Sequence, residues 1–203
     1  MSPTRAATYE RLLADWSIAE VGPALDLEAV FGRRAGVVLD IGFGGGEATI
    51  ELARAHPDED VLAIDVHTPG IGRLLDAIER DHLTNVRVID GDALVFVERL
   101  PRAVLLGVRI LFPDPWPKVR QRHRRLVRAD VVATLTDRLA PGGTLHIATD
   151  VADYAAQVLA VCTAEPRLVG GIVERPAGRT ITRFERRGLD AGRHPVDLEF
   201  TRR

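Results

Sequence analysis

Runs of consecutive aliphatic residues alternate with stretches of helical periodicity along most of this 203-residue chain. The aliphatic runs predict buried strands, because a strand that is covered on both faces needs apolar side chains on both. The expected strands cover residues 36–42, 60–66, 85–94 with their loop, part of 103–112, and 142–150, followed by two closing strands at 168–176 and 195–203. The expected helices cover residues 47–57, 69–83, 124–141 and 152–165.

This alternation predicts an α/β fold with a parallel sheet and helices on both faces. Ligands of such sheets bind beyond the carboxyl ends of the strands. No linker, repeat or low-complexity segment interrupts the pattern, so we expect a single domain over residues 1–203. Within it, residues 1–35 form an N-terminal segment for which we expect a partly covering helix around Trp16.

The composition narrows the class of protein. Hydrophobic residues make up 46% of the chain, and no apolar run approaches the roughly 18 residues of a membrane span. The N-terminus mixes both charge signs, unlike a signal peptide, so we expect a cytoplasmic protein. The only cysteine, Cys162, is expected to be buried, and His67, His123 and His194 lack the spacing of metal ligands, so we expect no metal site.

The first predicted strand ends in the sequence DIGFGGGE, which carries Asp40, Gly42, Gly44 and Gly46. The dinucleotide-binding fingerprint would need a glycine at position 47, where Glu stands, and no P-loop GK[ST] sequence is present. Glycines let the backbone turn sharply and approach a ligand closely. A loop of this form without a phosphate to hold suits S-adenosylmethionine, with Asp40 orienting the loop and the methionine moiety.

Acids also follow the next two predicted strands. Asp65 stands where a carboxylate can accept hydrogen bonds from both ribose hydroxyls, a feature that NAD-binding proteins share. Asp92 stands where it can accept from an adenine amino group. Each acid alone also suits a helix N-cap or a turn. Their occurrence after three successive strands, together with the glycine loop, favours a site for a cofactor that contains adenosine.

The fourth predicted strand ends in LFPDPWPK, residues 111–118. Proline cannot donate to a strand ladder and keeps the preceding residue out of the helical region. We therefore expect a rigid, extended segment that presents Asp114 to the substrate. Trp116 either stacks on a base or braces the turn. The fifth strand ends in ATD, which places Asp150 on the same edge, where it also suits capping of the next helix.

The net charge of −2 conceals a strong segregation of charge. Residues 118–128 carry six cations and no acid, and residues 175–203 carry eight arginines against four acids. These segments sum to +10, so the remainder carries −12. A basic surface on an acidic body suits a polyanionic partner, although either segment alone is also typical of a solvated helix face or a charged tail. Lys118 is the only lysine of the chain.

Taken together, these motifs resemble those of the bacterial tRNA (guanine-N7)-methyltransferases. The resemblance runs from about residue 36 to the C-terminus and rests on DIGFGGG, IDVHTPG, LFPDPWPK followed by RHRRL, HIATD and TRFERRG. It implies a Rossmann-like class I methyltransferase fold with seven mostly parallel strands and an antiparallel C-terminal strand. It also implies methyl transfer from S-adenosylmethionine to N7 of a guanosine in the variable loop of tRNA.

The resemblance also implies roles for individual residues. The implied cofactor site consists of Asp40, Gly42, Gly44, Gly46, Asp65, Asp92 and Asp114. Contacts with the substrate are implied for Lys118, Asp150, Thr182, Arg183, Phe184 and Glu185. Asp114 is in addition the implied catalytic residue. Arg183 stands where the family usually has lysine, and Val196 where it often has tryptophan, but no required charge is lost.

Guanine N7 carries a lone pair and no proton, so its methylation needs no base and positioning supplies most of the acceleration. We expect Asp114 to accept from the N1–H and N2–H2 edge of guanine, which also selects guanine over adenine. The expected partner is tRNA, bound by a monomer or homodimer without an obligate protein partner. Two other classes stay open: a small-molecule methyltransferase of this fold, and an RNA-binding protein that keeps a cofactor pocket without catalysis.

Overall fold

The computed structural model describes residues 3–203, with side chains from Tyr9 onward, so the first two residues of the predicted N-terminal segment 1–35 lie outside the described part of the chain. The chain divides into two compact units, Met1–Pro101 and Arg102–Arg203. The expectation of a single domain over residues 1–203 stays a prediction. None of the helices within residues 3–203 is both long enough and apolar enough to cross a membrane.

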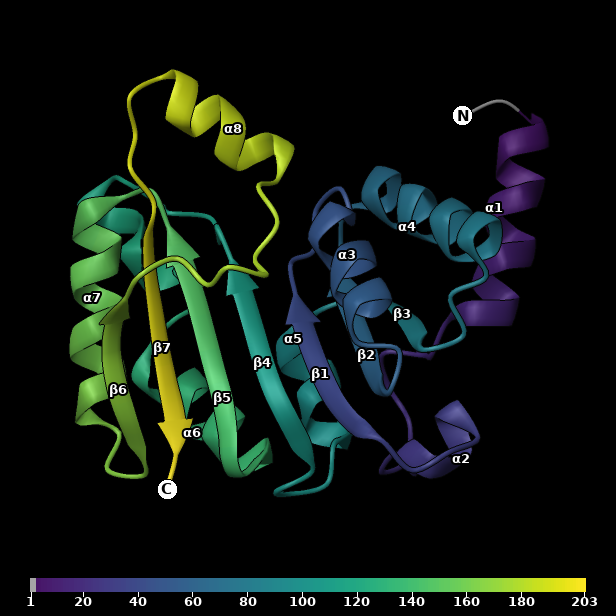
Figure 1. The fold of residues 1–203 in the computed structure, drawn as a ribbon, viewed down its shortest axis with the longest axis horizontal. Coiled ribbons are helices and arrows are strands. Elements are labelled where there is room, and N and C mark those ends of the chain that lie inside the picture. Colours follow the sequence, from purple (N-terminus) through teal and green to yellow (C-terminus); the bar gives the residue numbers. More distant parts are fainter. Residues whose placement is uncertain (1–2) are drawn as a thin grey trace. The chain divides into compact units, whose positions relative to one another are not determined.

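The first unit contains three parallel strands in the order β3-β2-β1 (Figure 1). The strands are β1 Gly36–Ile41, β2 Glu59–Asp65 and β3 Val86–Asp90. Their register pairs Ile41 with Ile64 and Ile64 with Ile89, so the carboxyl ends of all three strands lie level. The loops that follow the strands therefore begin at one edge of this sheet.

Several helices of this unit pack apolar side chains into the core of the sheet. The helices are α1 Pro3–Trp16, α2 Leu27–Phe31, α3 Glu47–Ala55, α4 Thr68–Asp81, α5 Ala93–Phe96 and the 3-10 turn η1 Val97–Arg99. Leu74 and Ile78 of α4 share one core with Val61 and Val86 of the sheet, and Leu12 of α1 is buried in the same core. Burial of one such side chain contributes about 1.5–3 kcal/mol. This core fixes α4, whose first turn adjoins the glycine loop.

The second unit contains four strands in the order β4-β5-β7-β6. They are β4 Leu105–Leu111, β5 Leu139–Thr149, β6 Leu168–Val173 and β7 Val196–Arg202. Strand β4 runs parallel to β5, whereas β7 is antiparallel to both of its neighbours. Over residues 3–203 the two units thus supply seven strands, and the predicted antiparallel C-terminal strand is confirmed.

The helices of the second unit differ from the prediction in two places. They are the 3-10 turn η2 Val119–Arg124, α6 Ala129–Arg138, α7 Ala152–Ala164 and α8 Arg183–Asp190. The helix predicted at 124–141 is wrong at both ends, because buried Arg125 and Val127 lie before α6 and β5 already begins at Leu139. Helix α8 was not predicted, although Thr182 and Glu185 fit the spacing of a capping box. In Figure 1, α8 lies beyond the carboxyl ends of β4 and β5.

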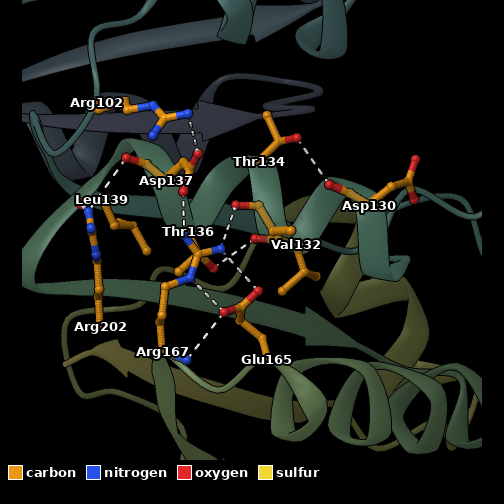
Figure 2. A network of polar contacts seen from close by, with 11 residues as sticks. Arg102, Asp130, Val132, Thr134, Thr136, Asp137, Leu139, Glu165, Arg167 and Arg202 are labelled. Carbon is orange, nitrogen blue, oxygen red and sulfur yellow. Dashed lines mark hydrogen bonds and ion pairs between the residues drawn. The ribbon is translucent and has the colours of Figure 1, made fainter.

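Figure 2 shows a network of charged side chains in the second unit. It lies at the edge of the sheet where strands β4 and β5 begin. Arg167 donates from Nε to Glu165 at 2.7 Å and also donates to Asp137, beside which Arg102 lies at 3.4 Å. The hydrogen bonds from Arg167 hold the pKa of both acids below their usual values. This network ties the end of α6 to the start of β6, far along the strands from the loop after β4.

Candidate active site

The loop after β1 turns at three glycines in the left-handed region. The φ angles of Gly42, Gly44 and Gly46 are 74°, 59° and 83°, values that side chains rarely adopt. The Gly42 N–H donates to the Ile64 carbonyl at 2.8 Å, which ties the loop to β2. A Cβ added at Gly42 or Gly44 would meet no atom of the described residues within 4 Å. The loop therefore borders open space, where a ligand can approach the backbone.

Asp65, at the end of β2, joins the glycine loop to the start of α4. Its Oδ2 accepts from the Gly44 N–H at 2.7 Å, and its Oδ1 accepts from the His67 N–H at 2.9 Å. The two segments lie very close, since a Cβ on Gly70 of α4 would be only 1.9 Å from the Gly44 carbonyl oxygen. Two of the predicted cofactor residues, Gly44 and Asp65, are thus in direct contact.

Asp40 and Asp92 occupy the ends of the other two strands. Asp40 is only 2% exposed and accepts from the Thr49 hydroxyl at 2.7 Å, so it links β1 to the first turn of α3. Asp92 caps α5 by accepting from the Leu94 N–H at 2.8 Å, which is the capping alternative that the sequence left open. Its own N–H donates to Glu20 at 2.5 Å. Contact of either acid with a cofactor stays a prediction.

The loop after β4 has a more unusual backbone than the sequence suggested. Phe112 and Trp116 each precede a proline and adopt φ angles of 55° and 40°, so the expectation of an extended segment is wrong at these two positions. Left-handed backbone costs a non-glycine residue about 1–2 kcal/mol. Because two such residues flank Asp114 on either side, the loop stores strain around that carboxylate.

Asp114 and Lys118, both predicted to meet the substrate, are exposed. Among the described residues, no hydrogen bond or ion pair reaches the Asp114 carboxylate, in contrast to Asp40, Asp65 and Asp92. The ring of Trp116 is covered by the Arg124 guanidinium, which lies 3.9 Å from the ring centroid. One face of this tryptophan is therefore already occupied, which favours the bracing role over stacking on a base.

Asp150, at the end of β5, is engaged within the same unit. It accepts from Arg193 Nε at 2.6 Å, and the residue that caps α7 is Val151, so the capping alternative is not realised. A Cβ on Gly188 of α8 would lie 3.0 Å from Asp150 Oδ2. The glycine of the FERRG sequence therefore permits α8 to approach this carboxylate.

Helix α8 is anchored through Glu185, which is 1% exposed. Its two carboxylate oxygens accept from Arg179 at 2.8 Å each, and Arg179 also donates to Asp197 of β7 at 2.9 Å. Thr182 caps the helix by accepting from the Glu185 N–H at 3.2 Å. A direct contact of Glu185 with a substrate stays a prediction, whereas its pairing with Arg179 is a feature of the fold.

The opposite side of α8 carries exposed residues. Phe184 is 51% exposed, and its ring lies 5.5 Å from the ring of Phe112, measured between centroids. Arg183, Arg186 and Arg187 are exposed around it. The contact between the two phenylalanines brings the loop after β4 and the TRFERRG sequence together in the second unit.

Three arginines hold these segments in place, and the sequence did not predict their roles. Arg179 binds Glu185, Arg193 binds Asp150, and buried Arg125 donates to the Pro115 carbonyl at 2.8 Å. All three belong to the segments that were grouped by net charge as basic surface. The sequence does not indicate which group each arginine binds. The partners lie on other elements, from 6 to 43 residues away along the chain.

Comparison with known proteins gives a consistent result. A family model described as "Putative methyltransferase" matches residues 34–198. A tRNA (guanine-N(7)-)-methyltransferase of Nitrosomonas europaea is 49% identical over 96% of this chain and 88% of its own length. A protein of the same name from Streptomyces avermitilis is 46% identical over 98% of this chain and 70% of its own length.

Solved structures agree with the fold. The 16S rRNA methyltransferase KamB superposes with a TM-score of 0.64 at 18% identity, over 90% of this chain and 95% of its own. A methyltransferase from Streptococcus mutans in complex with SAH superposes with a TM-score of 0.56 at 13% identity, over 100% of this chain and 99% of its own. These likenesses confirm the Rossmann-like methyltransferase fold.

Proposed function

The chain belongs to the tRNA (guanine-N(7)-)-methyltransferase family, and we propose that it transfers a methyl group from S-adenosylmethionine to N7 of a guanosine in the variable loop of tRNA. The observation that carries this proposal is the loop after β4. It presents Asp114, an exposed carboxylate that no hydrogen bond or ion pair from the described side chains reaches, between two strained aromatic residues. The same unit also carries the basic helix α8.

The loops of the first unit fit S-adenosylmethionine. Gly42 and Gly44 border open space in which a Cβ would meet nothing, so the backbone is accessible to the methionine moiety. Asp65 is half-buried at the end of β2, where acids of this fold accept from ribose hydroxyls. Asp40 accepts a hydrogen bond from Thr49 of α3, the helix that follows the glycine loop. A cationic sulfonium and amino group also suit this acid-rich set of loops better than a phosphate does.

The task of the protein in this reaction is to bind and orient. S-adenosylmethionine, when bound, supplies an electrophilic methyl group, and guanine N7 offers a lone pair without a proton, so no residue has to act as a base. The proposed role of Asp114 is to accept hydrogen bonds from guanine N1–H and N2–H2, which would orient N7 and favour the positive charge that the purine gains. Adenine carries an acceptor at N1 and would be repelled.

The RNA is bound by cations that the fold leaves exposed. Lys118 and Arg120 lie in the segment after the Asp114 loop, and Arg186 and Arg187 lie on α8. Contacts with phosphates give an affinity that falls steeply with salt. Arg125, Arg179 and Arg193 are excluded from this role because they are paired within the fold. The exposed Phe184 among arginines adds a surface on which an unstacked base can lie.

The identity of the methyl acceptor distinguishes the proposed activity from the two alternative functions. With labelled S-adenosylmethionine, we expect transfer to unmodified tRNA, loss of that transfer at high salt, and no transfer to free guanosine or small amines. Transfer to the small acceptors alone would indicate a small-molecule methyltransferase. Cofactor binding with no transfer to any acceptor would indicate a non-catalytic RNA-binding protein. A cytoplasmic monomer or homodimer that needs no protein partner completes the proposal.

A further inference from the structure

The Asp114 loop rests on a buried arginine. Arg125 is 1% exposed, and its Nε donates to the carbonyl oxygen of Pro115 at 2.8 Å. Pro115 directly follows Asp114, so this hydrogen bond grips the backbone next to the proposed catalytic carboxylate. A buried cation is costly unless all its donors are satisfied, which makes the choice of partners informative.

The other donors of the same guanidinium bind helix α7. Its Nη1 donates to Gln157 Oε1 at 2.8 Å and its Nη2 donates to Asp153 Oδ2 at 2.7 Å. The guanidinium also lies over the Tyr154 ring, 4.7 Å from the centroid. Arg125 therefore connects the loop after β4 to a helix that is itself packed against the sheet.

The loop needs such a connection because its backbone is strained. Phe112 and Trp116, on either side of Asp114, have left-handed φ angles that their side chains disfavour. The three prolines fix φ at 113, 115 and 117 but cannot hold the residues between them. Arg124 covers Trp116 from the neighbouring position, so two consecutive arginines act on this loop, one on a ring and one on a carbonyl.

Only arginine fits this arrangement. Three acceptors from two elements lie around one planar group, which matches the fixed fork of a guanidinium. A lysine ammonium is a compact charge and cannot reach all three acceptors from one place. The position therefore demands a geometry as well as a charge.

We propose that Arg125 is a positioning residue for methyl transfer, which holds the strained loop so that Asp114 meets guanine in the reactive orientation. This inference rests on the proposed function. Because Arg125 is buried beneath the loop, it acts on the substrate only through Asp114. Its loss is expected to lower kcat and to leave the binding of S-adenosylmethionine unchanged, since the proposed cofactor residues of the glycine loop are untouched.

The test compares Arg125→Lys with Val158→Ala, a destabilising change at a buried position of α7 that supplies none of the hydrogen-bond acceptors of the Arg125 guanidinium. At temperatures where both variants are folded, Arg125→Lys should lower kcat about 10²-fold, the cost of roughly 1 Å misplacement of a reacting group. Val158→Ala should keep kcat. Equal kcat in the two variants, with the wild type active, would overturn the inference. An inactive wild type would reject the proposed function instead.

A spectroscopic readout reports on the loop without turnover. The chain has two tryptophans, so in a Trp16→Phe background the fluorescence comes from Trp116 alone. Arg125→Lys should shift its emission, whereas Val158→Ala should not. If Arg125→Lys does not fold, Asp153→Asn is used in its place, since it weakens the pairing of Arg125 with α7 at a half-exposed position. This variant should lower kcat about tenfold and shift the emission of Trp116 in the same direction. An unshifted spectrum together with wild-type kcat would again overturn the inference.

Discussion

The ring of Phe112, at the end of β4, packs against the ring of Phe184 on α8, with centroids 5.5 Å apart and planes inclined by 50°. The separation lies within the range of about 4.5–7 Å over which aromatic rings attract one another. The pair joins the loop that carries Asp114 to the helix that carries the exposed arginines. This ring contact links the acid proposed to orient guanine with the surface proposed to bind RNA within the second unit.

Replacement of Phe184 tests this relationship. Phe184→Ala removes the stacking surface and should raise KM for tRNA about tenfold, since stacking of one base contributes about 1–3 kcal/mol. Loss of the contact with Phe112 should lower the free energy of unfolding by about 1 kcal/mol. Steady-state kinetics and denaturant titration measure the two effects. Leu189→Ala, at another exposed position of α8, is the control; an equal KM in both variants would contradict the account.

Asp114→Ala should lower turnover by about 10³-fold, comparable with the loss of a preorganised hydrogen-bonding group in other active sites. Because the glycine loop, Asp40, Asp65 and Asp92 are unchanged in this variant, calorimetric titration should show largely retained affinity for S-adenosylmethionine. The exposed acid Asp58 provides a control, since its replacement by alanine changes the same charge away from the proposed site. Full activity of Asp114→Ala would refute the role assigned to this carboxylate.

The cofactor loop is tested by a pair of matched glycines. Gly44 and Gly32 both have left-handed φ angles, of 59° and 71°, and a Cβ at either position would meet open space. Alanine at either should cost about 1–2 kcal/mol of stability through backbone strain. Only Gly44→Ala should weaken S-adenosylmethionine binding, by at least about tenfold, since about 1.4 kcal/mol of lost contact suffices. Equal affinities in the two variants would place the cofactor elsewhere.

Glu185→Gln should act on stability more than on tRNA binding. The substitution leaves buried Arg179 with one charged partner, Asp197, and removal of a partner from a buried pair costs about 3 kcal/mol or more. The same substitution at Glu28, in an exposed pair with Arg34, should cost well under about 1 kcal/mol. A stable Glu185→Gln protein with a raised KM for tRNA would show instead that this carboxylate contacts the substrate.

Acid should destabilise the protein through Asp153 and Asp137. The hydrogen bond from Arg125 lowers the pKa of Asp153 below its ordinary 3.8, and the one from Arg167 does the same for Asp137. An acid whose pKa is lower in the folded than in the unfolded protein stabilises the folded state at any pH above its pKa in the unfolded chain. This stabilisation is lost as the pH falls through the pKa of the acid in the folded protein. Melting temperatures should therefore be flat near neutral pH and fall below about pH 4. In Arg167→Ala the melting temperature should fall less steeply with decreasing pH. The same dependence on pH as in the wild type would contradict the role given to the Arg167–Asp137 pair.

The sequence predicted most of the sheet because its strands are aliphatic on both faces, a pattern that depends little on context. The core of β2, for example, is buried at every position from Asp60 to Ile64. The ends of the helices were less predictable. The stretch from Arg125 to Arg128 has helical composition, yet burial of Arg125 against α7 keeps it out of α6.

The sequence predicted which residues lie at the strand ends of the candidate site. It did not predict the backbone conformation of the loops or the hydrogen bonds and ion pairs that hold them. The rule for residues before proline excludes right-handed helix and says nothing of the left-handed region that Phe112 and Trp116 adopt. Net charge grouped Arg125 with Lys118, although the first is buried and paired while the second is exposed. Only tertiary packing decides which cation of a basic segment serves the fold and which remains for a ligand.

The most direct test of the account is the position of the methyl group on tRNA. Unmodified tRNA is incubated with the protein and labelled S-adenosylmethionine, and the product is cleaved by chemistry specific for N7-methylguanosine. We predict a single cleavage in the variable loop, with a rate of labelling that Asp114→Ala lowers about 10³-fold. Labelling at another atom or base, or no labelling of tRNA at all, would contradict the account.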